Sequence, residues 1–104
     1  MMTETELQKL IIENLNNSNL CKVWRANAGK LRVGKRTVQL LPKGFPDVFG
    51  VRLTDGKFIA IEIKKPDGKL SDKQIEFRDW AISNRFVYGV AHSVDDALKI
   101  IEEG

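Results

Sequence analysis

Apolar residues in this chain recur with the spacing of a helix in some segments and with that of a strand in others. Residues 3–17 have the helical period. Thr3 and Glu6 stand three positions apart before this apolar pattern, which is the spacing of an N-terminal capping box. The apolar stripe predicted for this helix consists of Leu7, Leu10, Ile11 and Leu15.

The remaining pattern predicts strands and two more helices. Strands are expected over residues 20–26, 48–53, 57–64 and 86–91, and helices over residues 71–84 and from residue 93 onward, each helix with a serine at its start. Residues 31–41 form either a second hairpin that turns at Gly34-Lys35 or a long basic loop. The order α-β-β-β-α-β-α predicts an α/β fold, a mixed central sheet flanked by helices, in a single domain over residues 1–104.

Asp55-Gly56 has the composition of a tight two-residue hairpin turn between residues 48–53 and 57–64. That turn would place Phe49 opposite Glu62 and Asp47 opposite Lys64. Because strand side chains alternate, one face of the second strand would carry Phe58, Ala60, Glu62 and Lys64, and the other Ile59, Ile61 and Ile63. We therefore expect Asp47, Glu62 and Lys64 to gather at the open end of one hairpin face.

A strand that is apolar on both faces is typical of a strand covered on both sides, so a carboxylate there needs a partner. One interpretation is an ion pair between Asp47 and Lys64, with Glu62 near the sheet rim. The other is a metal site, because two carboxylates and a carbonyl oxygen are hard ligands suited to Mg²⁺. A neighbouring lysine could then orient water and neutralise charge that grows on a phosphate.

Composition narrows the class of protein. Hydrophobic residues make up 42% and charged residues 30% of the 104, the proportions of an ordinary soluble protein. No apolar run approaches the roughly 20 residues of a membrane span, and the first residues resemble a helix rather than a secretory signal. A single cysteine, Cys21, excludes an internal disulfide and a multi-cysteine zinc site. We expect a cytoplasmic protein with no membrane partner.

The net charge of +3 is unevenly distributed. Residues 14–46 contain seven lysines and arginines and no acidic residue. Such a stretch is either a solvated basic face or a surface that binds a phosphate backbone. The candidate DNA contacts within it are Arg25, Lys30, Arg32, Lys35, Arg36 and Lys43.

Several segments resemble a known family. Pro46-Asp47 followed by Glu62-Ile63-Lys64 resembles the PD-(D/E)XK nuclease signature. Taken together, residues 24–29, 44–48, 61–65 and 68–74 are similar to a stand-alone VRR-NUC domain of the phage and bacterial type. The resemblance covers nearly the whole chain, to the strand-to-helix step at residues 90–94.

The resemblance implies a restriction-endonuclease-like fold and roles for individual residues. Asp47, Glu62 and the backbone carbonyl of Ile63 would bind Mg²⁺, for which Mn²⁺ would substitute. Lys64 would position or activate the attacking water. Gln74 would lie beside the site, although Ser71 and Gln74 also have the spacing of a capping box.

Members of this family also place an acid from the first helix near the metal. Glu4, Glu6 and Glu13 are the candidates here. Glu4 lies in line with the inward face of the helix, whereas Glu6 and Glu13 point roughly the other way. We favour Glu4, whose alternative role is a favourable interaction with the helix dipole.

The activity that the resemblance implies is metal-dependent endonucleolytic cleavage of DNA. Small members are similar to Holliday junction resolvases, which implies a homodimer and a preference for branched DNA. The alternatives are a non-catalytic nucleic-acid-binding module and a restriction nuclease, although 104 residues leave little room for a base-reading element. His92 is expected to be structural, and Cys21, Trp24 and Trp80 to lie in the core.

Overall fold

The computed structural model describes residues 2–27 and 30–104. The described chain forms the helices α1 (Glu4–Asn17), α2 (Asp72–Ser83) and α3 (Val94–Glu103) and the strands β1 (Cys21–Arg25), β2 (Lys30–Val33), β3 (Arg36–Gln39), β4 (Val48–Arg52), β5 (Phe58–Ile63) and β6 (Val87–Ala91). The predicted order gains two strands, because residues 31–41 contribute to a hairpin rather than a loop. Ala28 and Gly29, which end the first segment of the family resemblance, lie outside the described residues.

The helix starts follow the local sequence. The side chains of Thr3 and Ser71 each accept a hydrogen bond from the backbone N–H three residues on. The side chains of Glu6 and Gln74 in turn accept from the backbone N–H groups of Thr3 and Ser71, so both predicted capping boxes are present. Ser93 caps α3 through the backbone N–H of Asp96. These bonds satisfy N–H groups that a helix start otherwise leaves without partners.

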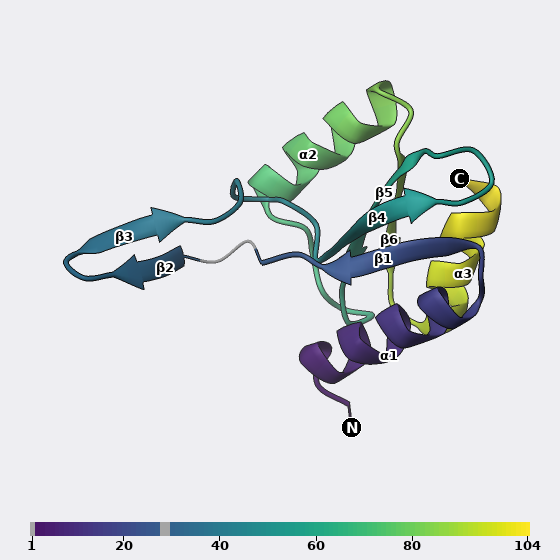
Figure 1. Cartoon of the computed structure of the whole chain (residues 1–104), viewed down its shortest axis with the longest axis horizontal. Coiled ribbons are helices and arrows are strands. Elements are labelled where there is room, and N and C mark those ends of the chain that lie inside the picture. The colour runs from purple at the N-terminus through teal and green to yellow at the C-terminus, as the bar shows by residue number, and fades with distance from the viewer. Residues whose placement is uncertain (1, 28–29) are drawn as a thin grey trace.

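In the described chain, a four-stranded sheet has the order β1-β4-β5-β6, and β2 pairs with β3 in a separate hairpin. The β5–β6 pair is parallel and the other neighbours are antiparallel, so the sheet is mixed as predicted. Helices α1 and α3 lie on one side of the sheet and α2 on the other, while the β2–β3 hairpin projects away from the body (Figure 1).

The aliphatic core lies between the sheet and the α1–α3 pair. Ile59, Ile61 and Ile63 of β5 point into it, which confirms the predicted face of that strand. From α1 the core takes Ile11 and Leu15, and from α3 it takes Ala97 and Ile101. The prediction for Leu10 was wrong, since this side chain is 38% exposed. At 100° per residue Leu10 lies well to the side of the row that contains Ile11 and Leu15.

The opposite face of the sheet is aromatic. Trp24 contacts Phe49, Phe49 stacks on Phe58, and Phe58 contacts Phe86, with ring centroids 4.9–6.3 Å apart. Trp80 of α2 meets Phe86 edge to face. The expected core positions of the two tryptophans were wrong, because Trp24 is 48% and Trp80 53% exposed. Trp24 lies on an edge strand.

The predicted β4–β5 register was wrong by two residues. Val48 pairs with Ile61 and Phe49 with Ala60, not with Glu62. The connection is a four-residue loop, because Arg52 donates its backbone N–H to the Lys57 carbonyl at 2.9 Å. A shift of two is a full side-chain period, so each side chain keeps its predicted face.

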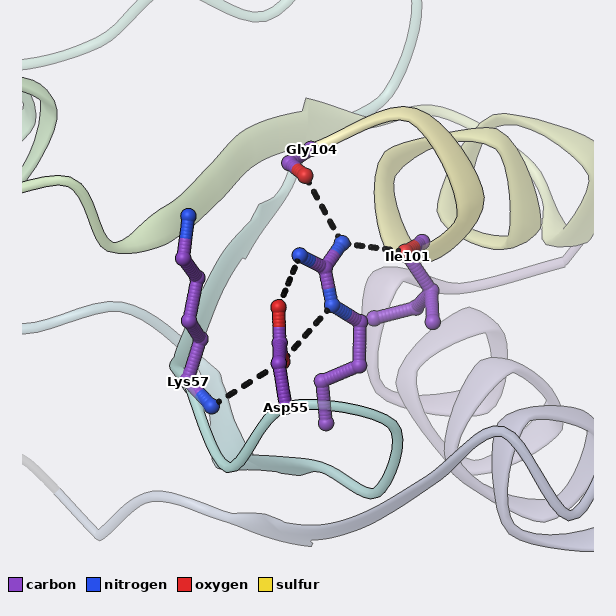
Figure 2. A network of polar contacts seen from close by, with 5 residues as sticks. Asp55, Lys57, Ile101 and Gly104 are labelled. Carbon is purple, nitrogen blue, oxygen red and sulfur yellow. Dashed lines mark hydrogen bonds and ion pairs between the residues drawn. The ribbon is translucent and has the colours of Figure 1, made fainter.

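Arg52 determines this longer loop (Figure 2). Its guanidinium forms two bonds to the Asp55 carboxylate, at 2.7 and 3.1 Å, and two more to the backbone oxygens of Ile101 and Gly104. Asp55 also accepts a bond from the backbone N–H of Lys57. One arginine therefore joins the β4–β5 loop to the end of α3, whose last carbonyls otherwise have no helical partner.

Replacing Asp55 should reveal an acid-dependent contribution to stability. Bonding to Arg52, then to the Lys57 backbone, lowers the pKa of Asp55 to about 2. The contribution is present above the ordinary carboxyl pKa and is lost as the pH falls towards 2. In thermal unfolding, Asp55→Asn should have a lower Tm than the wild type at pH 7, and the gap should close between about pH 4 and pH 2.

Asp67 is a suitable control because it is exposed in a loop. Asp67→Asn should follow the wild-type Tm across this pH range. A gap for Asp55→Asn that stays constant with pH would contradict the role given to its charge.

Candidate active site

The loop before β4 is held at both ends. Gly44 has φ +84°, and a Cβ at this position would clash with the backbone oxygen of Lys73 in α2. The backbone therefore passes directly against the first turns of that helix. Pro46 is buried, and the backbone N–H of Ala26 donates to the Asp47 carbonyl at 2.8 Å. Asp47 is fixed between the end of β1 and the start of β4.

The corrected register brings the two carboxylates together. Val48 pairs with Ile61, so one further step along the antiparallel pair places Asp47 opposite Glu62. Asp47 Oδ2 accepts a 2.8 Å hydrogen bond from the Ile63 backbone N–H. Glu62 is only 1% exposed, and its Oε2 has no hydrogen-bond partner among the described residues. A buried acceptor without a partner is costly, so this oxygen is a candidate ligand atom.

Electrostatics reflect this crowding. Burial raises the pKa of Glu62 to about 9, and the hydrogen bond and negative charge of Asp47 add to the rise. The charge of Glu4 acts in the same direction, while that of Lys64 opposes it. Two carboxylates this close cannot both ionise easily without a cation. A strongly perturbed carboxyl of this kind is typical of functional sites.

Lys64 follows β5 directly and is held through its backbone. Its N–H donates to the Ala91 carbonyl at 3.1 Å, and its carbonyl lies 2.9 Å from Nδ1 of His92. His92 thus has a structural contact, as expected of it. The alternative ion pair is not observed, since no described contact joins Lys64 to Asp47 within 4.0 Å.

The three candidate acids of α1 differ in their surroundings. Glu6 is engaged in the capping box, where Thr3 lowers its pKa, and Glu13 is exposed. Glu4 is half-buried, and its charge contributes to the raised pKa of Glu62. Glu4 is therefore the acid of this helix whose position suits the site.

Gln74 lies at the start of α2, where its Oε1 accepts a 2.8 Å bond from the Ser71 backbone. The capping role is confirmed by this bond. Any further role falls to its amide NH₂ group, for which the described residues provide no partner.

The sequence analysis missed Tyr88, which lies near the site, and Gln8, a buried polar residue of α1. Tyr88 of β6 has a buried hydroxyl without a partner among the described residues, and burial followed by the charge of Glu62 raises its pKa to about 12. Gln8 is buried one turn after Glu4. The period of α1 could have indicated Gln8. Tyr88 depends on the β5–β6 pairing, for which the sequence has no local signal.

The donor set fits a hard divalent cation. Asp47 and Glu62 supply carboxylate oxygens, one of them without a partner among the described residues, and Ile63, whose N–H bonds Asp47, follows Glu62 directly and offers a backbone carbonyl. In the described residues there is no cluster of three or more His, Cys, Asp and Glu side chains that could hold a metal. Any ion here would therefore need backbone oxygen, water or substrate to complete its coordination.

The structure divides the basic stretch into two groups. Arg25 ends β1 next to the Asp47 loop, and Lys43 lines a hollow of about 740 Å³ with Phe45, Phe77 and Trp80. Arg32, Lys35 and Arg36 lie on the projecting β2–β3 hairpin. Lys30 begins that hairpin, and its side chain is outside the described set.

A mixed sheet flanked by helices, with a carboxylate pair and a lysine at the end of one hairpin, defines a nuclease-type α/β domain. The VRR-NUC domain model matches residues 2–95, and the chain belongs to this family. The match confirms the resemblance and indicates a nuclease domain that acts on DNA. A search of curated proteins found no match. No helix in the described chain is long and apolar enough to cross a membrane.

Gly44→Ala should displace the Asp47 loop. Left-handed backbone costs a residue with a side chain about 1–3 kcal/mol, and the clash with Lys73 adds to this. Gly56→Ala is the matched control, because Gly56 also has positive φ but has open space around it. Urea unfolding should show a larger decrease in the free energy of unfolding for Gly44→Ala than for Gly56→Ala. Equal decreases would mean that the close contact of Gly44 with α2 does not affect stability.

Divalent metal should stabilise the fold through the carboxylate pair. At 100 times the Kd, a bound ion adds about 2.7 kcal/mol to the free energy of unfolding, so Mn²⁺ should raise the Tm by several degrees. Asp47→Asn should lose most of this shift, although its amide oxygen can still accept the bond from Ile63. Asp67→Asn should retain it. An unchanged shift in Asp47→Asn would place the ion elsewhere.

Proposed function

We propose that this chain is an endodeoxyribonuclease that hydrolyses phosphodiester bonds with Mg²⁺, for which Mn²⁺ substitutes. The observation that supports the proposal most strongly is the pair of Asp47 with the buried Glu62, beside Lys64, in which one Glu62 oxygen has no partner among the described residues. The cost of this arrangement is explained if a cation and a substrate phosphate complete it.

Each side chain has a role suited to its position. Asp47, Glu62 and the Ile63 carbonyl would hold the ion, which when bound supplies positive charge to the developing phosphorane-like oxygens. Lys64 orients the attacking water and neutralises charge on the phosphate. Glu4 supplements the carboxylate pair from α1, and the amide of Gln74 donates to substrate or water from the start of α2.

The cations of residues 25–43 bind the DNA backbone in this proposal. Arg25 and Lys43 are exposed close to the Asp47 loop, so they suit phosphates next to the scissile bond. Lys30, Arg32, Lys35 and Arg36 would contact DNA farther away. Each neutralised phosphate releases counterions, so binding should weaken steeply with salt.

We propose further that the enzyme is a homodimer that prefers branched DNA such as a Holliday junction. Paired cuts in a two-fold junction need two active sites related by two-fold symmetry. Trp80 is half exposed beside the aromatic hollow, and an apolar surface of this kind is suited to contact with a second copy.

A cleavage assay tests the nuclease proposal. Four-way junctions, flaps and linear duplexes are incubated with the protein and Mg²⁺, Mn²⁺ or EDTA. Cleavage should require metal, and Asp47→Asn, Glu62→Gln and Lys64→Ala should each lose about 10²–10³-fold or more in rate. Lys99→Ala, exposed on α3 at the other side of the sheet, should cleave at the wild-type rate.

Four results would contradict parts of the proposal. DNA binding without cleavage under any metal would indicate the alternative, a non-catalytic nucleic-acid-binding module. Undiminished cleavage by Asp47→Asn would mean that the activity comes from a contaminant. Cleavage of flaps or linear DNA but never of junctions would remove the resolvase-like preference, and a monomeric mass by light scattering would remove the dimer.

A further inference from the structure

The β2–β3 hairpin is a two-stranded ribbon that stands apart from the rest of the molecule (Figure 1). Its strands pair from Lys30–Gln39 to Val33–Arg36, and Gly34 forms the turn with φ +61°. Residues 31–40 are all exposed. A lone two-stranded hairpin is marginally stable in water at best, so a bound partner would stabilise this ribbon.

The two faces of the ribbon differ in chemistry. Residues directly opposite in an antiparallel pair share a face, so Arg32 and Thr37 lie on one face. Leu31 and Val38 lie on the other, which also carries Val33 and Arg36 next to the turn. In the described part of the chain, the Arg32 guanidinium has no hydrogen-bond or ion-pair partner.

We propose that the β2–β3 ribbon enters the major groove of intact duplex DNA beside the cleaved site. Arg32 and Thr37 would face the base edges, and Lys35 at the turn would face a phosphate. This inference rests on the proposed function for its partner, DNA. It assigns a groove-reading element to a chain whose length had argued against one.

Charge selects DNA as the partner. The ribbon lies within residues 14–46, which contain seven cations and no acidic side chain. A polyanion complements this stretch along its whole length. A hairpin-to-hairpin contact between two copies would instead bring the cations of both ribbons together.

Dimensions select the groove. Two strands lie about 4.8 Å apart, and their side chains widen the ribbon further. This ribbon fits a major groove about 12 Å wide but not a minor groove about 6 Å wide. Four residues at about 3.4 Å each span roughly 14 Å, the rise of about four base pairs.

The side chains also suit base edges. An arginine fork can bond both O6 and N7 of guanine, the commonest specific contact in the major groove, and a threonine hydroxyl can bond several bases. Arg32 is therefore expected to favour guanine at one position outside the cut.

The test measures duplex binding in EDTA, so that no DNA is cleaved. The wild type is bound to a duplex of about 25 base pairs and treated with dimethyl sulfate, which methylates guanine N7 in the major groove and adenine N3 in the minor groove. We expect protection of guanine N7 over about four base pairs. Arg32→Ala should abolish that protection and weaken binding about tenfold or more.

Leu31→Thr is the matched control, since residue 31 is the neighbour of Arg32 on the opposite face and threonine suits a strand. It should bind DNA as the wild type does. Hydrogen exchange of the amides of residues 31–39 should slow when duplex is added to the wild type.

Specific outcomes would overturn the inference. They are wild-type protection by Arg32→Ala, protection of adenine N3 alone, or amides that slow with protein concentration rather than with DNA. If the amides slow with protein concentration, and Leu31→Thr has a lower mass in solution than the wild type, the ribbon is a contact between two copies of the chain. Metal-dependent cleavage with no role for Arg32 in binding would contradict the ribbon inference but not the nuclease proposal. Groove binding with unimpaired cleavage by Asp47→Asn would contradict the nuclease proposal but not the ribbon inference.

Discussion

The placement of Glu62 on a buried strand is the constraint that organises the rest of the structure. Its carboxyl is 1% exposed, faces Asp47 and has an oxygen with no partner among the described residues. Burying a carboxyl in this way costs free energy that an apolar side chain at the same position would not cost. The surrounding fold keeps it in place through the buried strand β5, whose isoleucine face packs into the aliphatic core.

The same constraint explains why the neighbouring backbone is so firmly fixed. The Asp47 carboxylate is held by the Ile63 N–H and the Lys64 backbone by Ala91 and His92, so both residues are anchored at strand ends rather than in free loops. Positioning by rigid elements is what a phosphoryl-transfer site needs, because catalysis there depends on preorganised charge. The site is accordingly less stable than a fully apolar edge would be, and the proposed cation would offset this cost.

Local signals predicted much of this fold. Thr3, Ser71 and Ser93 were identified as caps from residue type and spacing alone, and the alternation in β5 assigned Glu62 and the isoleucines to the correct faces. The register failed because it depends on Arg52, whose partners include Asp55 nearby and Ile101 far along the chain. No local pattern reports such a long-range contact. The faces survived only because the error was an even number of residues.

Non-local pairing also determines what was missed at the site. Tyr88 reaches it through the parallel pairing of β6 with β5, and parallel partners have no connecting turn from which a register can be derived. For the basic stretch of residues 14–46, the sequence showed the residues but not their structural role. Its charge was evident, but charge alone does not distinguish a solvated face from an ordered element. The projection of β2–β3 separates its cations from Arg25 and Lys43, which remain near Asp47. If the sheet cleaves DNA and the ribbon binds it, as proposed, then changes to the ribbon alter affinity for DNA without altering the groups that cleave it.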